Sequence, residues 1–365
     1  MKIATVFGTR PEIIRLSEVI RLLDAHAEHL LIHTGQNYDP LLSDIFFAEL
    51  NVRTPDIHLG VKAAGFAEQA GQILARADAE LARLLPDRVL ILGDTNSGLV
   101  ALAAARRQIP VFHMEAGNRC YDDRVPEEVN RRVIDHCSTV LMPYTHRSKE
   151  NLVREGVERD RIFVTGNPIH EVLQRNEGRI ARSDVLSRLK LSPKRYVAVT
   201  MHRAENVDEE ARLTALVRGL ELVAWKLAEP VVVSVHPRTR ERIRSFGLRA
   251  ERLVLVDPLG FADFVRLERD ARLVISDSGT VQEECAILRV PNVTIRDVTE
   301  RPETIECGSN ILSGADPADL LRAVGVALET GVDWTPPAEY LAVSVSRTVL
   351  KILLGYASQR RQTAL

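Results

Sequence analysis

The sequence that decides the fold is residues 109–119, Ile-Pro-Val-Phe-His-Met-Glu-Ala-Gly-Asn-Arg. Its apolar first half predicts a buried strand, and the polar residues that follow predict the carboxyl end of that strand. In open parallel sheets, ligands bind outside the carboxyl ends of the strands. We therefore interpret Glu115 as an acid or base of a functional site. A structural cluster of salt bridges is the alternative interpretation.

Short apolar runs alternate with longer amphipathic stretches, and this alternation is typical of βαβ units in a parallel sheet. One series of predicted strands comprises residues 3–7, 30–33, 88–92, 111–113, 139–142 and 162–164. A second series comprises residues 196–200, 231–235, 253–256, 273–276 and 292–295. Two doubly wound, Rossmann-like α/β domains in tandem explain the two series.

The polar, Arg-rich residues 176–194 separate the two series. The predicted domains are residues 1–168 and 169–344, with a hinge near residues 167–180. Apolar residues at helical spacing after residue 345 predict a terminal helix within residues 345–365. We expect this helix to pack back on the first domain, and its polar tail from Ser358 to fray.

Length and composition exclude several classes of protein. A chain of 365 residues with 45% hydrophobic content can bury two cores, since single cores stop growing near about 250–300 residues. Lys and Arg total 48 against 50 Asp and Glu, which argues against a nucleic-acid partner. No apolar run approaches the roughly 20 residues that span a bilayer. The amino terminus has no signal-peptide pattern, so we expect a cytoplasmic protein.

The four cysteines are widely scattered and include no Cys-x-x-Cys pair. This spacing predicts free thiols in a reducing compartment and no zinc site. Neither half carries the Gly-x-Gly-x-x-Gly fingerprint with a ribose-binding acid, and there is no Walker lysine loop. A hydride carrier is therefore disfavoured, and we interpret any bound anion as part of the substrate.

The first predicted strand is followed by Gly8-Thr-Arg-Pro-Glu. Gly8 permits a tight turn and Pro11 favours a first helical position. Arg10 and Arg15 are then candidates to face a phosphate. Ordinary helix capping is the alternative.

The strand at residues 273–276 is followed by Asp277-Ser-Gly-Thr-Val-Gln-Glu-Glu, a turn of small residues that leads into a helix. The free N–H groups of such a helix suit an anion, and a diphosphate is the expected occupant. The predicted contacts are Ser278, Gly279 and Thr280 to phosphate, Glu284 to ribose hydroxyls, and Arg301 as countercharge. A simple capping box is the alternative.

Three further polar positions follow predicted strands: Asp94, His202 and His236. Asp94 and His202 belong to different halves, and we expect an inter-domain cleft to bring them together beside Glu115 and Glu127. For His236, a structural role and a ligand role both stay open.

Together these residues resemble the non-hydrolysing UDP-N-acetylglucosamine 2-epimerase family, over nearly the whole chain. The resemblance rests on nine ordered motifs: Gly8-Thr-Arg-Pro-Glu, Thr34-Gly-Gln, Gly93-Asp-Thr, His113-Met-Glu-Ala-Gly, Pro126-Glu-Glu-Val-Asn-Arg, Thr165-Gly-Asn, His202-Arg-Ala-Glu-Asn, Ser276-Asp-Ser-Gly and Arg296-Asp-Val-Thr-Glu-Arg-Pro-Glu. It implies a GT-B fold, with the two domains facing across a cleft. It also implies a homodimer and no redox cofactor or metal.

The reaction implied is inversion at C2 of a UDP-amino sugar, by anti elimination of UDP to a 2-acetamidoglucal and re-addition. The positions that match the catalytic group are Asp94, Glu115, Glu127 and His202. The predicted substrate-binding residues are Arg10, Arg15, Arg131, His236, Phe264, Ser278, Gly279, Thr280, Glu284 and Arg301. A carboxylate is expected to move the C2 proton, and which one does so stays open.

Several positions depart from the family pattern. Arg15 replaces a Lys, Asn37 a His, Asn118 a Leu and Thr280 a Gly, and the segment between Arg119 and Pro126 is short. The Glu-Ala-Gly-Asn-Arg-Cys version and the closing Ser344-Val-Ser resemble a branch that includes epimerases for modified sugars, such as UDP-2,3-diacetamido-glucuronate or UDP-N-acetylfucosamine-type substrates. UDP-GlcNAc, epimerised to UDP-ManNAc, is the leading substrate. The alternatives are a hydrolysing 2-epimerase, a GT-B glycosyltransferase and a non-catalytic nucleotide-sugar sensor.

Overall fold

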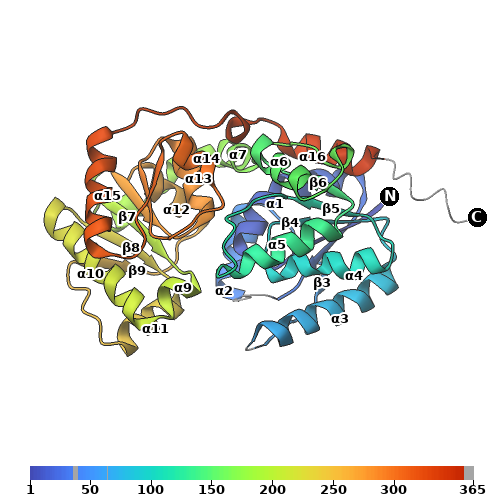
Figure 1. Cartoon of the computed structure of the whole chain (residues 1–365), viewed down its shortest axis with the longest axis horizontal. Helices are drawn as coiled ribbons and strands as arrows, with labels where there is room; N and C mark the ends of the chain where they lie inside the picture. Colours follow the sequence, from blue (N-terminus) through green and yellow to red (C-terminus); the bar gives the residue numbers. More distant parts are fainter. Residues whose placement is uncertain (36–39, 64, 357–365) are drawn as a thin grey trace, which may run out of the picture. The chain divides into compact units, whose positions relative to one another are not determined.

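The computed structural model describes residues 1–35, 40–63 and 65–356 (Figure 1). Asn37 and the polar tail from Ser358 lie outside these residues. The chain forms two compact units. The first comprises Met1–Gln174 and the segment from Glu339 onward, and the second comprises Arg175–Ala338.

The first unit contains a six-stranded sheet in the order β3-β2-β1-β4-β5-β6, and every strand pair in it is parallel. Its strands are β1 (Lys2–Phe7), β2 (Glu28–His33), β3 (Ile57–His58), β4 (Arg88–Leu92), β5 (Val111–Met114) and β6 (Val140–Met142). Its helices are α1 (Arg10–His26), α2 (Pro40–Glu49), α3 (Phe66–Leu84), α4 (Val100–Arg106), α5 (Pro126–Cys137), α6 (His146–Arg154) and α16 (Val345–Gly355), with short 3-10 turns at Asn96–Leu99, Arg159–Arg161 and Ala338–Leu341.

The second unit repeats this topology in the order β12-β11-β10-β7-β8-β9, also with parallel pairs throughout. Its strands are β7 (Val197–Met201), β8 (Val231–Val235), β9 (Leu253–Val256), β10 (Leu273–Ser276), β11 (Asn292–Thr294) and β12 (Asn310–Leu312). Its helices are α8 (Val185–Arg188), α9 (Ala204–Val207), α10 (Glu210–Leu227), α11 (Pro237–Ser245), α12 (Phe261–Arg269), α13 (Gly279–Leu288), α14 (Pro302–Glu306) and α15 (Pro317–Thr330). Two doubly wound α/β sheets are therefore confirmed.

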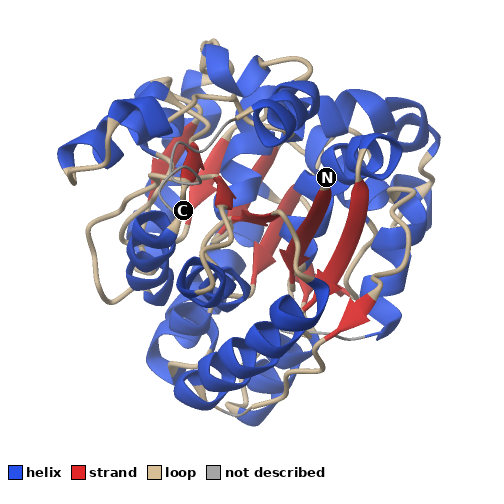
Figure 2. Cartoon of the chain, turned by 90° about the vertical axis from the view of Figure 1, so that its right-hand side faces the viewer, coloured by secondary structure: helices blue, strands red, loops and turns tan. Residues whose placement is uncertain are grey.

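The strands are apolar because helices cover both faces of each sheet, as Figure 2 shows. In β4, Val89, Leu90 and Ile91 are fully buried although their side chains alternate between the two faces. Burying one large aliphatic side chain contributes about 1.5–3 kcal/mol. These runs therefore hold each unit together and fix the register of its strand ends.

One predicted strand is wrong. Residues 162–164 form only a single bridge, between Ile162 and Leu141. The N–H groups of Phe163 and Thr165 donate to the carbonyls of Leu141 and Pro143, but Pro143 has no N–H with which to continue the ladder.

The segment predicted to hold the hinge is mostly helical. Helix α7 spans Ile169–Arg182, and the boundary between the two units falls inside it, between Gln174 and Arg175. In the first unit, Ser346 of α16 donates from its N–H and its hydroxyl to Glu171 of α7, at 2.9 and 2.6 Å. Helix α16 also packs against α1. The predicted domain bounds and the hinge motion stay predictions.

The four cysteines form no disulfide, as their spacing predicts. Across the described residues, no helix combines the length and the apolar character that crossing a bilayer requires.

Candidate active site

Each sheet has a switch point where the chain turns from one direction of winding to the other. This point lies between β1 and β4 in the first sheet and between β7 and β10 in the second. Ligands of doubly wound sheets bind outside the carboxyl ends of these strands. The residues there are Gly8 and Asp94 in the first unit, and His202 and Asp277 in the second.

Glu115 directly follows β5 and is 8% exposed. Its backbone has a φ of +64°, a left-handed conformation that is uncommon for a residue other than glycine and is frequent at functional sites. The Tyr144 hydroxyl donates to its Oε2 at 3.2 Å, and the Asn118 amide donates to its Oε1 at 3.4 Å. A Cβ at Gly93 would lie 3.9 Å from Oε2, so the carboxylate lies beside the loop that carries Asp94.

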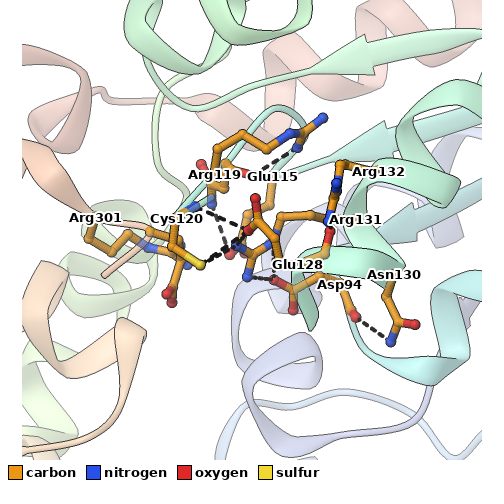
Figure 3. A network of polar contacts seen from close by, with 12 residues as sticks. Asp94, Glu115, Arg119, Cys120, Glu128, Asn130, Arg131, Arg132 and Arg301 are labelled. Carbon is orange, nitrogen blue, oxygen red and sulfur yellow. Dashed lines mark hydrogen bonds and ion pairs between the residues drawn. The ribbon is translucent and has the colours of Figure 1, made fainter. Parts of the chain in front are cut away.

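Asp94 lies at one end of a polar network (Figure 3). Its Oδ2 accepts from Arg131 Nε at 3.1 Å and Nη2 at 2.6 Å, and Arg131 Nη1 donates to Glu128 at 2.6 Å. Glu128, fully buried, also accepts the backbone N–H groups of Cys120 and Tyr121, both at 3.0 Å. Arg131 thus holds Asp94 and the loop after β5 in place. Burial raises the pKa of the Cys120 thiol to about 11, which disfavours it as a nucleophile.

Glu127, the predicted catalytic residue of the same run, lies in the first turn of α5 and is half-buried. Adjacent helical residues point in directions about 100° apart. Glu128 therefore faces Arg131 while Glu127 points elsewhere. Glu128 was not among the predicted site residues, although an acid three residues before an arginine on a helix is a signal for such a pair.

A second buried network lies behind β5. His113 contacts the Gly93 carbonyl through Nε2 at 2.8 Å and Asp135 through Nδ1 at 2.9 Å. Arg119 pairs with Asp135 at 2.8 Å and with Glu155 at 2.6 Å. Burial acts to raise the pKa of Asp135, but its hydrogen bonds and the charges of His113 and Arg119 lower it. Arg119 therefore belongs to a structural cluster of salt bridges, which was the alternative interpretation of the run at residues 109–119.

Gly117 allows the loop after β5 to pack tightly on α6. Its φ is +79°, and a Cβ there would lie 2.3 Å from the Ser148 carbonyl oxygen. We expect Gly117→Ala to lower the free energy of unfolding by roughly 3 kcal/mol, because a clash adds to backbone strain. Urea denaturation of the two proteins measures this.

Gly156→Ala is the matched control, since Gly156 has a φ of +89° and open space around it. Backbone strain alone predicts that Gly156→Ala lowers the free energy of unfolding by about 1–2 kcal/mol. Equal losses at the two positions would mean that the close approach of the loop to α6 is absent.

Glu12, which belongs to the Gly8-Thr-Arg-Pro-Glu motif but was not a predicted site residue, joins two loops of the first unit. Its Oε2 accepts the N–H groups of Gly8 and Thr9, at 2.9 and 2.7 Å, and its Oε1 accepts the Thr95 hydroxyl at 2.9 Å. Burial raises the pKa of Glu12 to about 7, against the opposing effect of these donors. Glu12 thus ties the loop after β1 to the loop after β4. The capping spacing Thr9-x-x-Glu12 was a signal for it.

The two predicted phosphate-binding arginines lie in different surroundings. The Arg10 guanidinium lies 5.7 Å from the centroid of the Phe46 ring and is half-buried. Arg15 is 2% exposed on the inner face of α1. The capping interpretation holds for this loop, because Thr9 and Glu12 form a capping box and Pro11 lies in the first turn.

In the second unit, Asp277 orients His202. The His202 Nδ1 lies 3.2 Å from Asp277 Oδ1, and the backbone N–H of His202 donates to Oδ2 at 3.0 Å. Arg203 N–H and Asn206 Nδ2 also donate to Oδ2, at 2.9 and 3.1 Å. Burial acts to raise the pKa of Asp277, but the charge of His202 and these donors lower it well below its usual range. The His202 ring itself is half-exposed. Asp277 was missed as a site residue, although it directly follows a predicted strand.

The predicted anion-binding turn opens α13. Ser278 is its N-cap residue, and the Ser278 and Thr280 hydroxyls lie 3.0 Å apart. A Cβ at Gly279 would lie 2.5 Å from Glu300 Oε1. Because it has no Cβ, the glycine lets the buried Glu300 carboxylate approach the turn closely.

Glu284, one turn along α13, hydrogen-bonds Glu268 of α12, and both are buried. Burial and the negative charge of Glu284 raise the pKa of Glu268 well above its ordinary value. The ribose-binding role expected for Glu284 stays a prediction.

The last three predicted residues have structural contacts of their own. Arg301 pairs with Glu283 and lies 3.6 Å from Glu300. Phe264 packs against the apolar cluster below α12 and α13. His236 caps α11 by accepting the Arg238 N–H at 3.3 Å, so a structural role is shown for it.

Comparisons with known proteins agree with these motifs. A family model described as UDP-N-acetylglucosamine 2-epimerase matches residues 21–354. The chain is 40% identical to the UDP-N-acetylglucosamine 2-epimerase of Methanocaldococcus jannaschii, over 92% of this chain and 95% of the relative.

It is also 36% identical to the UDP-2,3-diacetamido-2,3-dideoxy-D-glucuronate 2-epimerase of Pseudomonas aeruginosa, over 86% of this chain and 89% of the relative. A crystal structure of the M. jannaschii UDP-GlcNAc 2-epimerase in complex with UDP-GlcNAc and UDP superimposes with a TM-score of 0.92. It is 38% identical and covers 97% of this chain and 99% of that one.

Proposed function

Because the chain belongs to the UDP-N-acetylglucosamine 2-epimerase family, we propose that it inverts C2 of a UDP-N-acetyl amino sugar. The observation that carries this proposal is the Glu115 carboxylate. This carboxylate is buried at the end of β5 and accepts hydrogen bonds from the neutral donors Tyr144 and Asn118. The backbone of Glu115 has a left-handed conformation. Such a carboxylate is aimed and desolvated, as a general base must be.

The chemistry needs a base and a stabilised leaving group together. A C2 proton without an adjacent carbonyl is poorly acidic, so it leaves only as the C1–O bond to UDP breaks. Anti elimination then gives a 2-acetamidoglucal and UDP. Re-addition of UDP, with a proton delivered to the opposite face of C2, completes the inversion.

We infer that Glu115 removes the C2 proton. Asp94 makes two hydrogen bonds to the Arg131 guanidinium through its Oδ2, so this carboxylate oxygen is committed to the polar network. Glu115 instead receives hydrogen bonds from an amide and a phenol. Asp94 and Glu127 are then the candidates to return a proton to C2.

The second unit is proposed to hold UDP. The amino terminus of α13 at Ser278, Gly279 and Thr280 offers N–H groups and hydroxyls to the diphosphate, and Glu284 accepts from the ribose. His202, oriented by Asp277, stabilises the departing diphosphate through its outer ring nitrogen.

UDP-GlcNAc and UDP-2,3-diacetamido-glucuronate are the two substrates that the relatives indicate. We expect the protein to epimerise at least one of them without added metal or nicotinamide. Incubation with a panel of UDP-sugars, followed by NMR of the products, measures this. Recovery of every substrate unchanged would contradict the proposal.

The same incubation separates the alternatives. Free UDP and free amino sugar in equal amounts would indicate the hydrolysing variant, and transfer to an added acceptor would indicate a glycosyltransferase. The homodimer and the cytoplasmic location expected from the sequence stay predictions.

A further inference from the structure

Asn118 lies between Glu115 and a chain of hydroxyl groups on α6. Its amide Nδ2 donates to Glu115 Oε1 at 3.4 Å, and its Oδ1 accepts the Ser148 hydroxyl at 2.9 Å. The Ser148 oxygen in turn accepts from the Thr145 hydroxyl at 3.2 Å. Every hydrogen bond in this relay therefore points its donor toward the carboxylate.

The relay is buried and is fixed at the start of α6. Thr145, Ser148, Asn118 and Glu115 are each less than a tenth exposed. Thr145 is the N-cap of α6 and its oxygen accepts the Ser148 N–H at 3.1 Å, which fixes the start of the relay. Gly117 brings the loop close enough to α6 for Asn118 to reach Ser148. Hydrogen bonds aligned in one direction polarise one another, and their effect is strongest away from water.

We propose that Asn118 is a positioning residue of the reaction: the Thr145–Ser148–Asn118 relay holds the Glu115 carboxylate oriented toward C2 of the sugar. Ser148 fixes the Asn118 amide with its oxygen toward α6 and its NH2 toward Glu115. Tyr144 binds the other carboxylate oxygen at 3.2 Å. This inference rests on the proposed function, because it assigns a role within that reaction.

The charged and titratable groups described near Glu115 include Asp94, Glu128 and Arg131 in the network of Figure 3, Tyr144 after β6, and the buried network of His113, Asp135 and Arg119. The relay itself contains no titratable group. A change in Asn118 or Ser148 therefore alters the hydrogen bonding of Glu115 without adding or removing a charge.

The test is the pH profile of kcat/KM for Asn118→Leu, which keeps the size and removes the donor. We expect the acidic limb to move up by about one pH unit and kcat to fall about tenfold, since a hydrogen bond to a charged group is worth roughly this much. KM is expected to change little. Ser148→Ala, which leaves Asn118 in place but unfixed, is expected to shift the limb in the same direction by a smaller amount.

Asn151→Leu is the matched control. Asn151 is a buried amide on the same helix that donates to the Gly117 carbonyl at 3.0 Å and is not in the relay. It is expected to lower thermal stability without moving the acidic limb. If Asn118→Leu unfolds, Ser148→Ala decides the test.

Two failures are distinguishable. An unchanged limb in both Asn118→Leu and Ser148→Ala, with an active wild type, would overturn the role of the relay. A wild-type protein that epimerises no UDP-amino sugar would instead overturn the proposed function.

Discussion

Glu115→Gln is expected to lower epimerisation about a thousandfold, because loss of a general base typically costs about 10²–10⁴ in rate. Glutamine has the same shape and keeps an oxygen for the Tyr144 hydroxyl, but it cannot accept the C2 proton. UDP binding is expected to stay close to that of the wild type. Initial rates by NMR and UDP titration by calorimetry measure the two quantities.

Glu150→Gln is the control for this substitution. Glu150 is exposed on α6, so the same chemical change there is expected to leave the rate unaltered. Residual activity above a tenth of the wild type in Glu115→Gln would move the role of base to Asp94 or Glu127.

His202→Ala is expected to lower kcat by about 10²–10³, the usual cost of removing a donor that stabilises developing negative charge. The departing diphosphate gains charge as the C1–O bond breaks, and the half-exposed imidazole is the group proposed to meet it. His26→Ala, an exposed histidine at the end of α1, is the control. A fall in kcat/KM that comes from KM alone would make His202 a binding residue only.

Asp277, the partner of His202, makes the stability of the fold depend on pH. A carboxylate whose pKa is lowered in the folded protein stabilises the fold above its ordinary pKa of 3.8, and this contribution is lost as the pH falls below that value. The stability difference between wild type and Asp277→Asn is therefore expected to be largest at neutral pH and to shrink on acidification. His202→Ala leaves Asp277 with its backbone donors and is expected to lose less stability than Asp277→Asn does.

The sequence predicted the architecture because the signal was local. Apolar runs followed by polar strand ends place Glu115, Asp94 and His202 at carboxyl ends of parallel strands, as the structure has them. It missed β3 and β12, which have two and three residues. It also predicted a strand at residues 162–164, where Pro143 of the neighbouring chain segment stops the ladder.

The partners of the charged residues were not predictable in this way. Arg131 pairs with Asp94, 37 positions earlier, and Arg301 pairs with Glu283, 18 positions earlier. Both arginines look like ligand contacts in the sequence, but each is bound by carboxylates in the fold. Likewise, nothing in the run around Asn118 indicates Ser148, which reaches it only through the packing of α6.

Exchange of the C2 hydrogen with solvent is the most direct test of the claim that a base removes this hydrogen during epimerisation. With epimerisation run in D2O and the nucleotide sugar recovered, we predict deuterium at C2 of the epimerised product, because the proton removed exchanges with solvent before the opposite face is protonated. An epimerised product that keeps its original hydrogen at C2 would contradict the account.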